Sequence, residues 1–157
     1  MVDGEQLREA MRRFAAPIAV VTITTEGREL AVTVGSLASL SLEPALVGVS
    51  IGRGSPLHEP LRQSGRFATS LLAGDQAGLA QHFARGVPPI ALWSGVVRHP
   101  SELPEPLLEG ALAWLECRVE HECEAGDHTV FVAGVLSVEL GRPGPPLVYL
   151  DGGYRSL

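Results

Sequence analysis

The pattern of hydrophobic and polar positions predicts a mainly β chain with a few short helices. Apolar residues recur at helical spacing over residues 7–14, and Pro17 ends this amphipathic segment. Two β-branched runs, at 18–25 and 29–35, flank the turn Glu26-Gly27 and predict a hairpin. Further strands are expected at residues 46–52, 67–72 and 146–150.

Two more short helices are predicted between these strands. Ser55 and Pro56 stand where a helix N-cap and its first residue are expected, and that helix should end near Gly65. Asp75 is expected to cap a helix that runs to about Phe83. The proline-rich residues 86–110 are predicted to form a long loop with one short segment at 92–97. A loop of this length in a compact domain is more often functional or interface-forming than idle.

The C-terminal third carries the clearest β pattern. Residues 115–124 alternate strictly, so Leu115, Cys117, Val119, His121 and Cys123 are predicted to face the core. Residues 129–140 are apolar on both faces. A strand of this kind is expected to be buried on both sides, and the second face therefore predicts a dimer.

These elements define the expected fold class and domain organisation. Mostly antiparallel strands with two inserted helices suggest a closed or nearly closed β-barrel. A length of 157 residues fits a single domain over residues 1–157. With 45% hydrophobic and 19% charged residues, global disorder is excluded.

Charge and cysteine content narrow the classes of partner. The net charge is −6 and all twelve cations are arginines, so neither nucleic acid nor an anionic membrane surface is the expected partner. The acidic start, Met1-Val-Asp-Gly-Glu5, is unlike a signal peptide, and the apolar runs are short for a membrane helix. Cys117 and Cys123 make no disulfide framework. The expectation is a soluble protein of the reducing cytoplasm.

The first candidate site is Ser50-Ile-Gly-Arg-Gly-Ser-Pro56, where a strand runs into a helix N-terminus. Such a terminus suits a phosphate group. Gly52 and Gly54 let a ligand approach the backbone. Ser55 offers a hydroxyl, and the Arg53 guanidinium could donate two parallel hydrogen bonds to a phosphate. The segment lacks the Lys and Gly spacing of a P-loop, so the motif alone favours an ordinary strand–turn–helix junction.

Two further segments are candidates. The hydroxyl-rich stretch 33–41 could lay backbone groups along the edge of a flat heterocycle, although Ser and Gly also favour surface loops. His121, Cys123, Asp127 and His128 surround one turn, but they have no metal-ligand spacing, and Cys123 is interpreted as a small buried apolar residue. His128 could donate to a ligand, whereas its position alone favours a turn histidine bonded to Asp127.

In order along the chain, these segments resemble the flavin reductase-like family, the FMN-binding split β-barrel group of NAD(P)H:flavin oxidoreductases. The segments that carry the resemblance are Pro17-Ile-Ala-Val-Val-Thr22, residues 33–44, Val47-Gly-Val-Ser-Ile51, Ser64-Gly-Arg-Phe67, Leu79-Ala-Gln-His-Phe-Ala84, residues 111–117, Gly126-Asp-His-Thr-Val-Phe-Val-Ala-Gly-Val135 and residues 146–154. Many members have Asn-Ser-Phe at Gly35-Ser36-Leu37, so a side-chain contact and a ring are missing here. Many also have Pro-Pro at Pro44-Ala45.

The resemblance implies a mainly β, antiparallel Greek-key split β-barrel that binds one flavin per subunit in a homodimer. It implies that FMN, with FAD as the alternative, contacts Thr33, Val34, Gly35 and Ser36 through its isoalloxazine. It implies that Ser50, Ile51, Gly52, Arg53, Ser55, Phe83 and Arg85 lie near the ribityl chain and phosphate. It implies that His128, the candidate catalytic residue, and Tyr154 lie on the nicotinamide side. The residue spacing described above predicts no metal site.

The implied activity is hydride transfer from NAD(P)H to the flavin, with a protein that supplies orientation and electrostatics. The chain would then be an NAD(P)H-dependent FMN reductase, with an oxygenase component as a candidate partner. Two alternatives remain at this stage. One is a flavin-binding electron carrier without NAD(P)H turnover, and the other is a barrel that has lost flavin and serves only in protein interactions.

Overall fold

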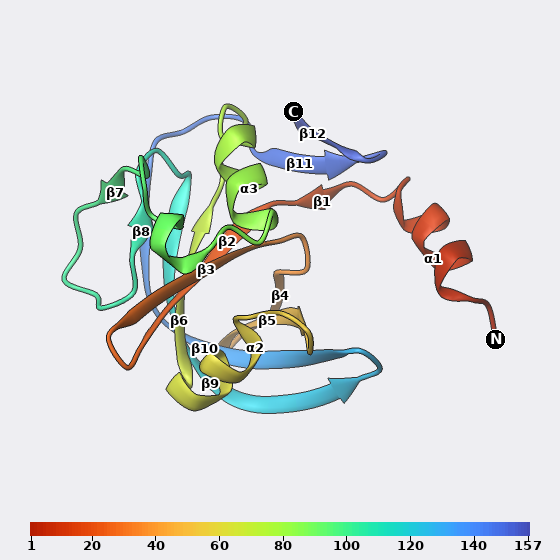
Figure 1. Ribbon diagram of the computed structural model, residues 1–157, viewed down its shortest axis with the longest axis horizontal. Coiled ribbons are helices and arrows are strands. Elements are labelled where there is room, and N and C mark those ends of the chain that lie inside the picture. Colours follow the sequence, from red (N-terminus) through yellow and green to blue (C-terminus); the bar gives the residue numbers. More distant parts are fainter.

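A seven-stranded antiparallel sheet forms the body of the computed structural model, which describes residues 1–157 (Figure 1). Its strand order is β3-β2-β6-β9-β10-β5-β4. The strands are β2 (Ala19–Thr25), β3 (Arg28–Val34), β4 (Ala38–Leu42), β5 (Ala45–Gly52), β6 (Arg66–Leu71), β9 (Ala113–Ala125) and β10 (His128–Leu140). The prediction of a mainly β, antiparallel fold is confirmed, and the expected hairpin at 18–35 is the β2–β3 pair.

Two small sheets and three α-helices complete the fold. The small sheets are β1-β11-β12, with β1 (Ala16–Pro17), β11 (Leu147–Leu150) and β12 (Gly153–Ser156), and β7-β8, with β7 (Arg98–His99) and β8 (Leu107–Leu108). The helices are α1 (Gly4–Met11), α2 (His58–Ser64), α3 (Ala77–Ala84) and the 3-10 turn η1 (Pro89–Ala91). None of them has the length and apolar character that a membrane-spanning helix requires.

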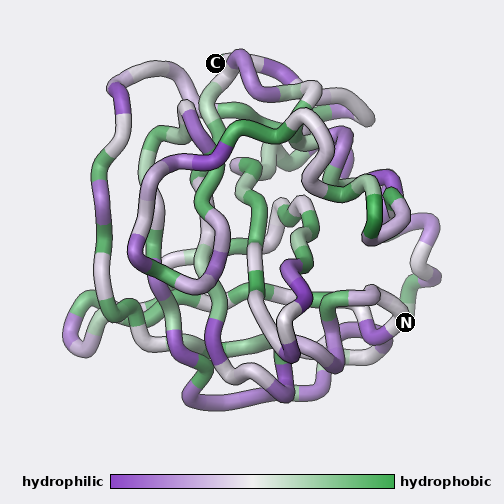
Figure 2. Tube along the Cα trace, turned by 60° about the vertical axis from the view of Figure 1, so that its left-hand side comes forward, coloured by the Kyte–Doolittle hydropathy of each residue, from purple (hydrophilic) through white to green (hydrophobic).

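The core lies between the strands and the two inserted helices. Its largest cluster includes the fully buried Phe67 and Phe131, with Leu57 and Leu61 packed from the α2 side. A second cluster joins Phe83 of α3 to β2 and β11. Figure 2 shows hydrophobic residues recurring along the inner strands, while many hydrophilic residues lie in the connections at the periphery. This packing fixes α2 and α3 against the sheet.

The predicted core face of residues 115–124 is correct only for its first half. Cys117 is fully buried, whereas His121 and Cys123 are exposed. β6 pairs with β9 only up to Arg118, so the rest of β9 has β10 as its single neighbour. A bulge in β9 also breaks the alternation, because Glu120 has no partner between the Val132–His121 and Ala133–Val119 pairs. The interpretation of Cys123 as a buried residue is therefore wrong.

Both predicted helix caps are also wrong. α2 begins at His58, three residues after Ser55, because the chain first makes two tight turns. In these turns Ser55 N–H donates to Gly52 C=O, and His58 N–H donates to Ser55 C=O. The Ser55 hydroxyl only accepts from Leu57 N–H, at 3.3 Å. α3 has Gln76 as its N-cap, while Asp75 pairs with Arg142 instead.

The long segment 86–110 is tied to the sheet at several points. The Thr22 hydroxyl donates to Pro106 C=O at 2.7 Å, and Trp93 Nε1–H donates to Glu29 C=O at 2.9 Å. His99 stacks on Trp114, with ring centroids 3.8 Å apart. The short segment expected at 92–97 consists largely of turns. This loop therefore covers one face of the sheet.

Candidate functional site

A cleft of about 350 Å³ lies where three segments that are distant in sequence meet. The end of β3 and the following turn form one wall, the end of β5 forms the other, and the first residue of β10 completes it. The lining residues are Val32, Thr33, Val34, Gly35, Ser36, Ser50, Ile51, Gly52, Ser55 and His128. Nine of these ten are site residues predicted from the sequence; the structure brings them together.

Ser36 joins the two walls of the cleft. β4 pairs with β5 only as far as Gly48, so the backbone groups of Ser50 are left without a strand partner on that edge. The Ser36 hydroxyl replaces that partner: it donates to Ser50 C=O at 2.9 Å and accepts from Ser50 N–H at 3.1 Å. One side chain thus sets the separation of the two walls.

Gly52 and His128 lie opposite each other in the β5–β10 register. A Cβ atom placed on Gly52 would lie 3.6 Å from His128 Nε2, so a larger side chain here would fill the cleft. His128 Nδ1 lies 2.7 Å from Asp127 Oδ1. An ionised carboxylate only accepts, so Nδ1 carries the proton and Nε2 faces the cleft.

Asp127 orients this ring from the exposed turn. The hydrogen bond from His128 holds the pKa of the Asp127 carboxyl below its usual value. The expectation that His128 bonds to Asp127 is confirmed. The same histidine also lines the cleft, so the two interpretations of His128 are compatible.

Thr33 ties the cleft to α3. Its hydroxyl donates to Ala80 C=O at 2.5 Å, so it is committed to the protein rather than free for a ligand. The backbone of Val34, Gly35 and Ser36 is what this wall offers to a ligand. A second cavity, of about 210 Å³, adjoins the cleft: Val32 and Ser55 line both.

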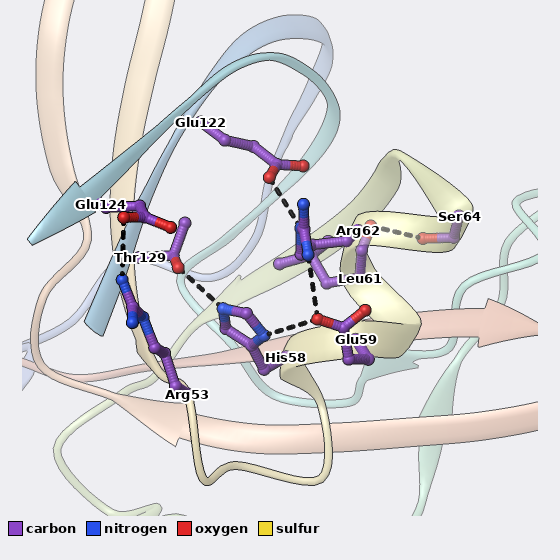
Figure 3. Close-up of polar contacts among 9 residues, drawn as sticks. All are labelled: Arg53, His58, Glu59, Leu61, Arg62, Ser64, Glu122, Glu124 and Thr129. Carbon is purple, nitrogen blue, oxygen red and sulfur yellow. Dashed lines mark hydrogen bonds and ion pairs between the residues drawn. The ribbon is translucent and has the colours of Figure 1, made fainter. Parts of the chain in front are cut away.

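Four predicted site residues do not line the cleft. Arg53 forms an ion pair with Glu124 at 3.3 Å (Figure 3), and its backbone N–H donates to Asp127 C=O at 2.9 Å. Phe83 is buried and lines the adjoining cavity, and Arg85 is the exposed C-cap of α3. Tyr154 packs edge-on against Tyr149 in the β11–β12 hairpin, where burial raises the pKa of its hydroxyl.

Two features near the cleft were not predicted. Val32 lines it as the residue of β3 directly before the predicted segment 33–36. The buried His58 and Thr129 form a hydrogen bond next to it, at 2.7 Å. A histidine directly after the apolar Leu57 and three residues before the apolar Leu61 is a weak sequence signal for such a buried contact.

The chemistry of the cleft suits a flat polar heterocycle. Its walls offer backbone N–H and C=O groups, the Ser36 and Ser55 side chains and one imidazole, with no carboxylate and no guanidinium among the lining residues. The floor is open because Gly52 has no side chain. The structure holds no group of three or more His, Cys, Asp or Glu side chains in metal-binding geometry.

Fold and cleft together define a mainly β protein with a cleft lined largely by backbone groups, and the comparisons identify its family. Residues 11–157 match the flavin reductase like domain, so the chain belongs to that family. It is 38% identical over 153 residues to the reductase component of 4-hydroxyphenylacetate 3-monooxygenase from Thermus thermophilus, covering 98% of this chain and 96% of that protein.

Two further proteins support the assignment. An NADH-dependent flavin reductase from a Rhodococcus species is 38% identical over 154 residues, covering 96% of this chain and 85% of the relative. The solved structure of the NADH:FAD oxidoreductase SgcE6 from Streptomyces globisporus superposes with a TM-score of 0.92 at 30% identity, covering 100% of this chain and 96% of that one. The resemblance stated from the sequence is confirmed.

Proposed function

We propose that this protein is an NAD(P)H-dependent flavin reductase that binds FMN or FAD in the cleft between β3, β5 and β10. It acts as the reductase component of a two-component monooxygenase. Relatives that share its whole length are flavin reductases named for NADH, or reductase components of monooxygenases. They favour this function over the electron carrier and over a barrel without flavin.

The observation that carries the proposal is the convergence of three segments on one cleft. Residues 32–36, residues 50–52 with Ser55, and His128 are far apart in sequence, yet they line a single site. The residues fit a flavin because the glycines leave backbone exposed where a flat ring needs close approach. A Cβ at Gly52 would occupy that space.

Each wall has its own task in binding. The backbone N–H groups of Gly35 and Ser36 would donate to the carbonyl edge of the isoalloxazine and stabilise negative charge on the reduced ring. The turn from Gly52 to Ser55 would hold the ribityl chain, with the Ser55 hydroxyl near the phosphate. When bound, the flavin supplies the hydride acceptor; none of these residues acts as a nucleophile.

Phosphate neutralisation requires side chains outside the cleft lining. Arg85 is exposed and forms no ion pair, so its guanidinium is free to meet a phosphate beside Phe83. Arg53 would first have to leave Glu124, with which it forms an exposed ion pair. Exposed pairs of this kind contribute about 0–1 kcal/mol, which a charge-assisted bond to phosphate can replace.

His128 is the residue that would meet the nicotinamide. Its Nε2 faces the cleft and can accept a hydrogen bond from a carboxamide N–H, while Asp127 holds the ring orientation through Nδ1. Binding and orienting NAD(P)H is its task. Tyr154 belongs to the same role by family resemblance, although the single chain keeps it outside the cleft.

A homodimer of split β-barrels is the proposed assembly, and exposed apolar side chains on the body and on α1 support it. On the body, Leu42, Val138 and Leu140 are 88%, 59% and 81% exposed. On α1, which stands clear of the body in Figure 1, Leu7 and Met11 are exposed and no residue is buried. An isolated helix this short is marginal in water, so a second copy is the expected cover.

Free thiols at both cysteines fit the proposed cytoplasmic location.

The function is tested by titration and anaerobic reduction. The purified protein should quench FMN or FAD fluorescence on binding, and NADH or NADPH should bleach the bound flavin without a second protein. Comparing the two nucleotides under the same conditions shows which one is the donor. A protein that binds flavin and needs a separate protein donor would be the electron carrier instead.

A further inference from the structure

The end of the β9–β10 hairpin that carries His128 is paired with β5 through its backbone, and three side-chain links add to this pairing (Figure 3). Arg53 pairs with Glu124, and Arg62 Nε donates to Glu122 at 2.8 Å. The third link joins His58, the first residue of α2, to Thr129. β6 does not reach this part of β9, so the links to Glu122 and Glu124 are made where β9 has β10 as its single strand neighbour.

Only the third of these links is buried. His58 is 6% exposed and Thr129 is 5% exposed, whereas the arginine links lie at the surface. His58 Nε2 lies 2.7 Å from the Thr129 hydroxyl, and its ring packs edge-on against Phe131, with centroids 5.8 Å apart. A buried hydrogen bond in a packed setting has one geometry, whereas exposed ion pairs exchange readily.

Glu59 lies beside the other nitrogen of the His58 ring. His58 Nδ1 lies 3.4 Å from Glu59 Oε1, and a hydrogen bond from Arg62 lowers the pKa of Glu59. Nδ1–H therefore points at the carboxylate, which leaves Nε2 to accept from the Thr129 hydroxyl. Figure 3 shows the ring between these two partners.

Strand geometry connects this bond to the cleft. Thr129 directly follows His128, and neighbouring side chains of a strand point to opposite faces. The Thr129 side chain points inward to His58, so the His128 side chain points outward over Gly52. A rotation of the strand about its axis would move both side chains together.

We propose that the buried His58–Thr129 hydrogen bond positions His128 over the flavin cleft, and so makes His58 and Thr129 positioning residues for the nicotinamide. This inference rests on the proposed function of His128. The bond does not touch the ligand; it restricts the rotation of β10 at its first residues. Its loss should weaken NAD(P)H binding and leave flavin binding to the opposite wall unchanged.

The test is a double-mutant cycle between Thr129 and His128, measured as KM for NADH, kcat and the flavin Kd. Thr129→Val removes the hydroxyl and keeps the shape, and Thr129→Ser restores it. Thr69→Val is the matched control, because Thr69 is equally buried in β6 and its hydroxyl has no hydrogen-bond partner. His58→Leu and His58→Gln form a second pair in case Thr129→Val does not fold.

Thr129→Val should raise KM for NADH about 3- to 10-fold, as the net contribution of one hydrogen bond allows, with the flavin Kd unchanged. Thr129→Ser, His58→Gln and Thr69→Val should stay near wild type. In a His128→Ala background, Thr129→Val should have no further effect on KM.

Failure of the inference and failure of the proposed function give different results. If His128→Ala leaves KM for NADH unchanged, the proposed role of His128 is wrong. If His128→Ala raises KM but folded Thr129→Val does not, the positioning role is overturned. It is also overturned if Thr129→Val raises KM equally in both backgrounds, because the effect then bypasses His128.

Discussion

Replacing Ser36 by alanine tests how the two walls of the cleft are held together. The substitution removes both hydrogen bonds to Ser50, at 2.9 and 3.1 Å, and leaves the backbone groups of Ser50 to water. Each such bond contributes about 0.5–1.5 kcal/mol net, and Ser36 is exposed, so we expect the two together to contribute about 1–2 kcal/mol. The flavin must then restore the wall separation when it binds.

This free energy corresponds to a roughly 5- to 30-fold increase in the flavin Kd, since about 1.4 kcal/mol is a factor of ten. The assay is a titration of FMN and FAD by fluorescence quenching. The control is Ser39→Ala on β4, because the Ser39 side chain lies in a different, apolar cavity lined by Leu37 and Val47. A Ser36→Ala protein that binds flavin as tightly as Ser39→Ala would refute the role given to this side chain.

Three further predictions follow from the same structure. His128→Ala should raise KM for NADH more than it weakens flavin binding, and equal KM values in steady-state assays would remove its role. Burial raises the pKa of Cys117 to about 12, whereas Cys123 is exposed. An alkylating reagent at neutral pH should therefore label one thiol of the native protein and two thiols after unfolding. In the Cys123→Ser variant it should label no thiol of the native protein. Burial also raises the pKa of Glu105, whose Oε2 has no hydrogen-bond partner, so the folded state holds this proton more tightly than the unfolded state. The stability that the protonated Glu105 contributes is therefore lost as pH rises above about 4.5. Because glutamine stays neutral, the Tm of Glu105→Gln relative to that of wild type should increase from pH 4 to pH 7. A constant Tm difference would show that Glu105 stays in one protonation state over this range.

Local patterns predicted the strands well because β-branched runs and turn residues act over a few positions. The hairpin at β2–β3 and strands β5, β6 and β11 follow their sequence signals closely. β4 was not predicted as a strand because its Ser-rich sequence has low β-propensity; its pairing with β5 is a tertiary effect. The exposure of His121 also depends on where β6 begins, at Arg66, which lies far away in sequence.

The site shows the same division between local and long-range information. The family resemblance named nine of the residues that line the cleft, because each lies in a short recognisable segment. It could not show that Arg53 pairs with Glu124, since that contact requires the hairpin to pass over the turn after β5. The burial of His58 likewise depends on Thr129, 71 residues away.

The most direct test of the central claim blocks the cleft and measures reduction anaerobically. Gly52→Leu places a side chain beside His128 Nε2, and the backbone of Gly52 is an ordinary strand conformation, so the fold should tolerate it. Wild-type protein mixed with flavin and NADH without oxygen should bleach the flavin absorbance, while folded Gly52→Leu should neither bind flavin nor bleach it. If folded Gly52→Leu reduces flavin at the wild-type rate, the cleft between β3, β5 and β10 is not the site of the reaction.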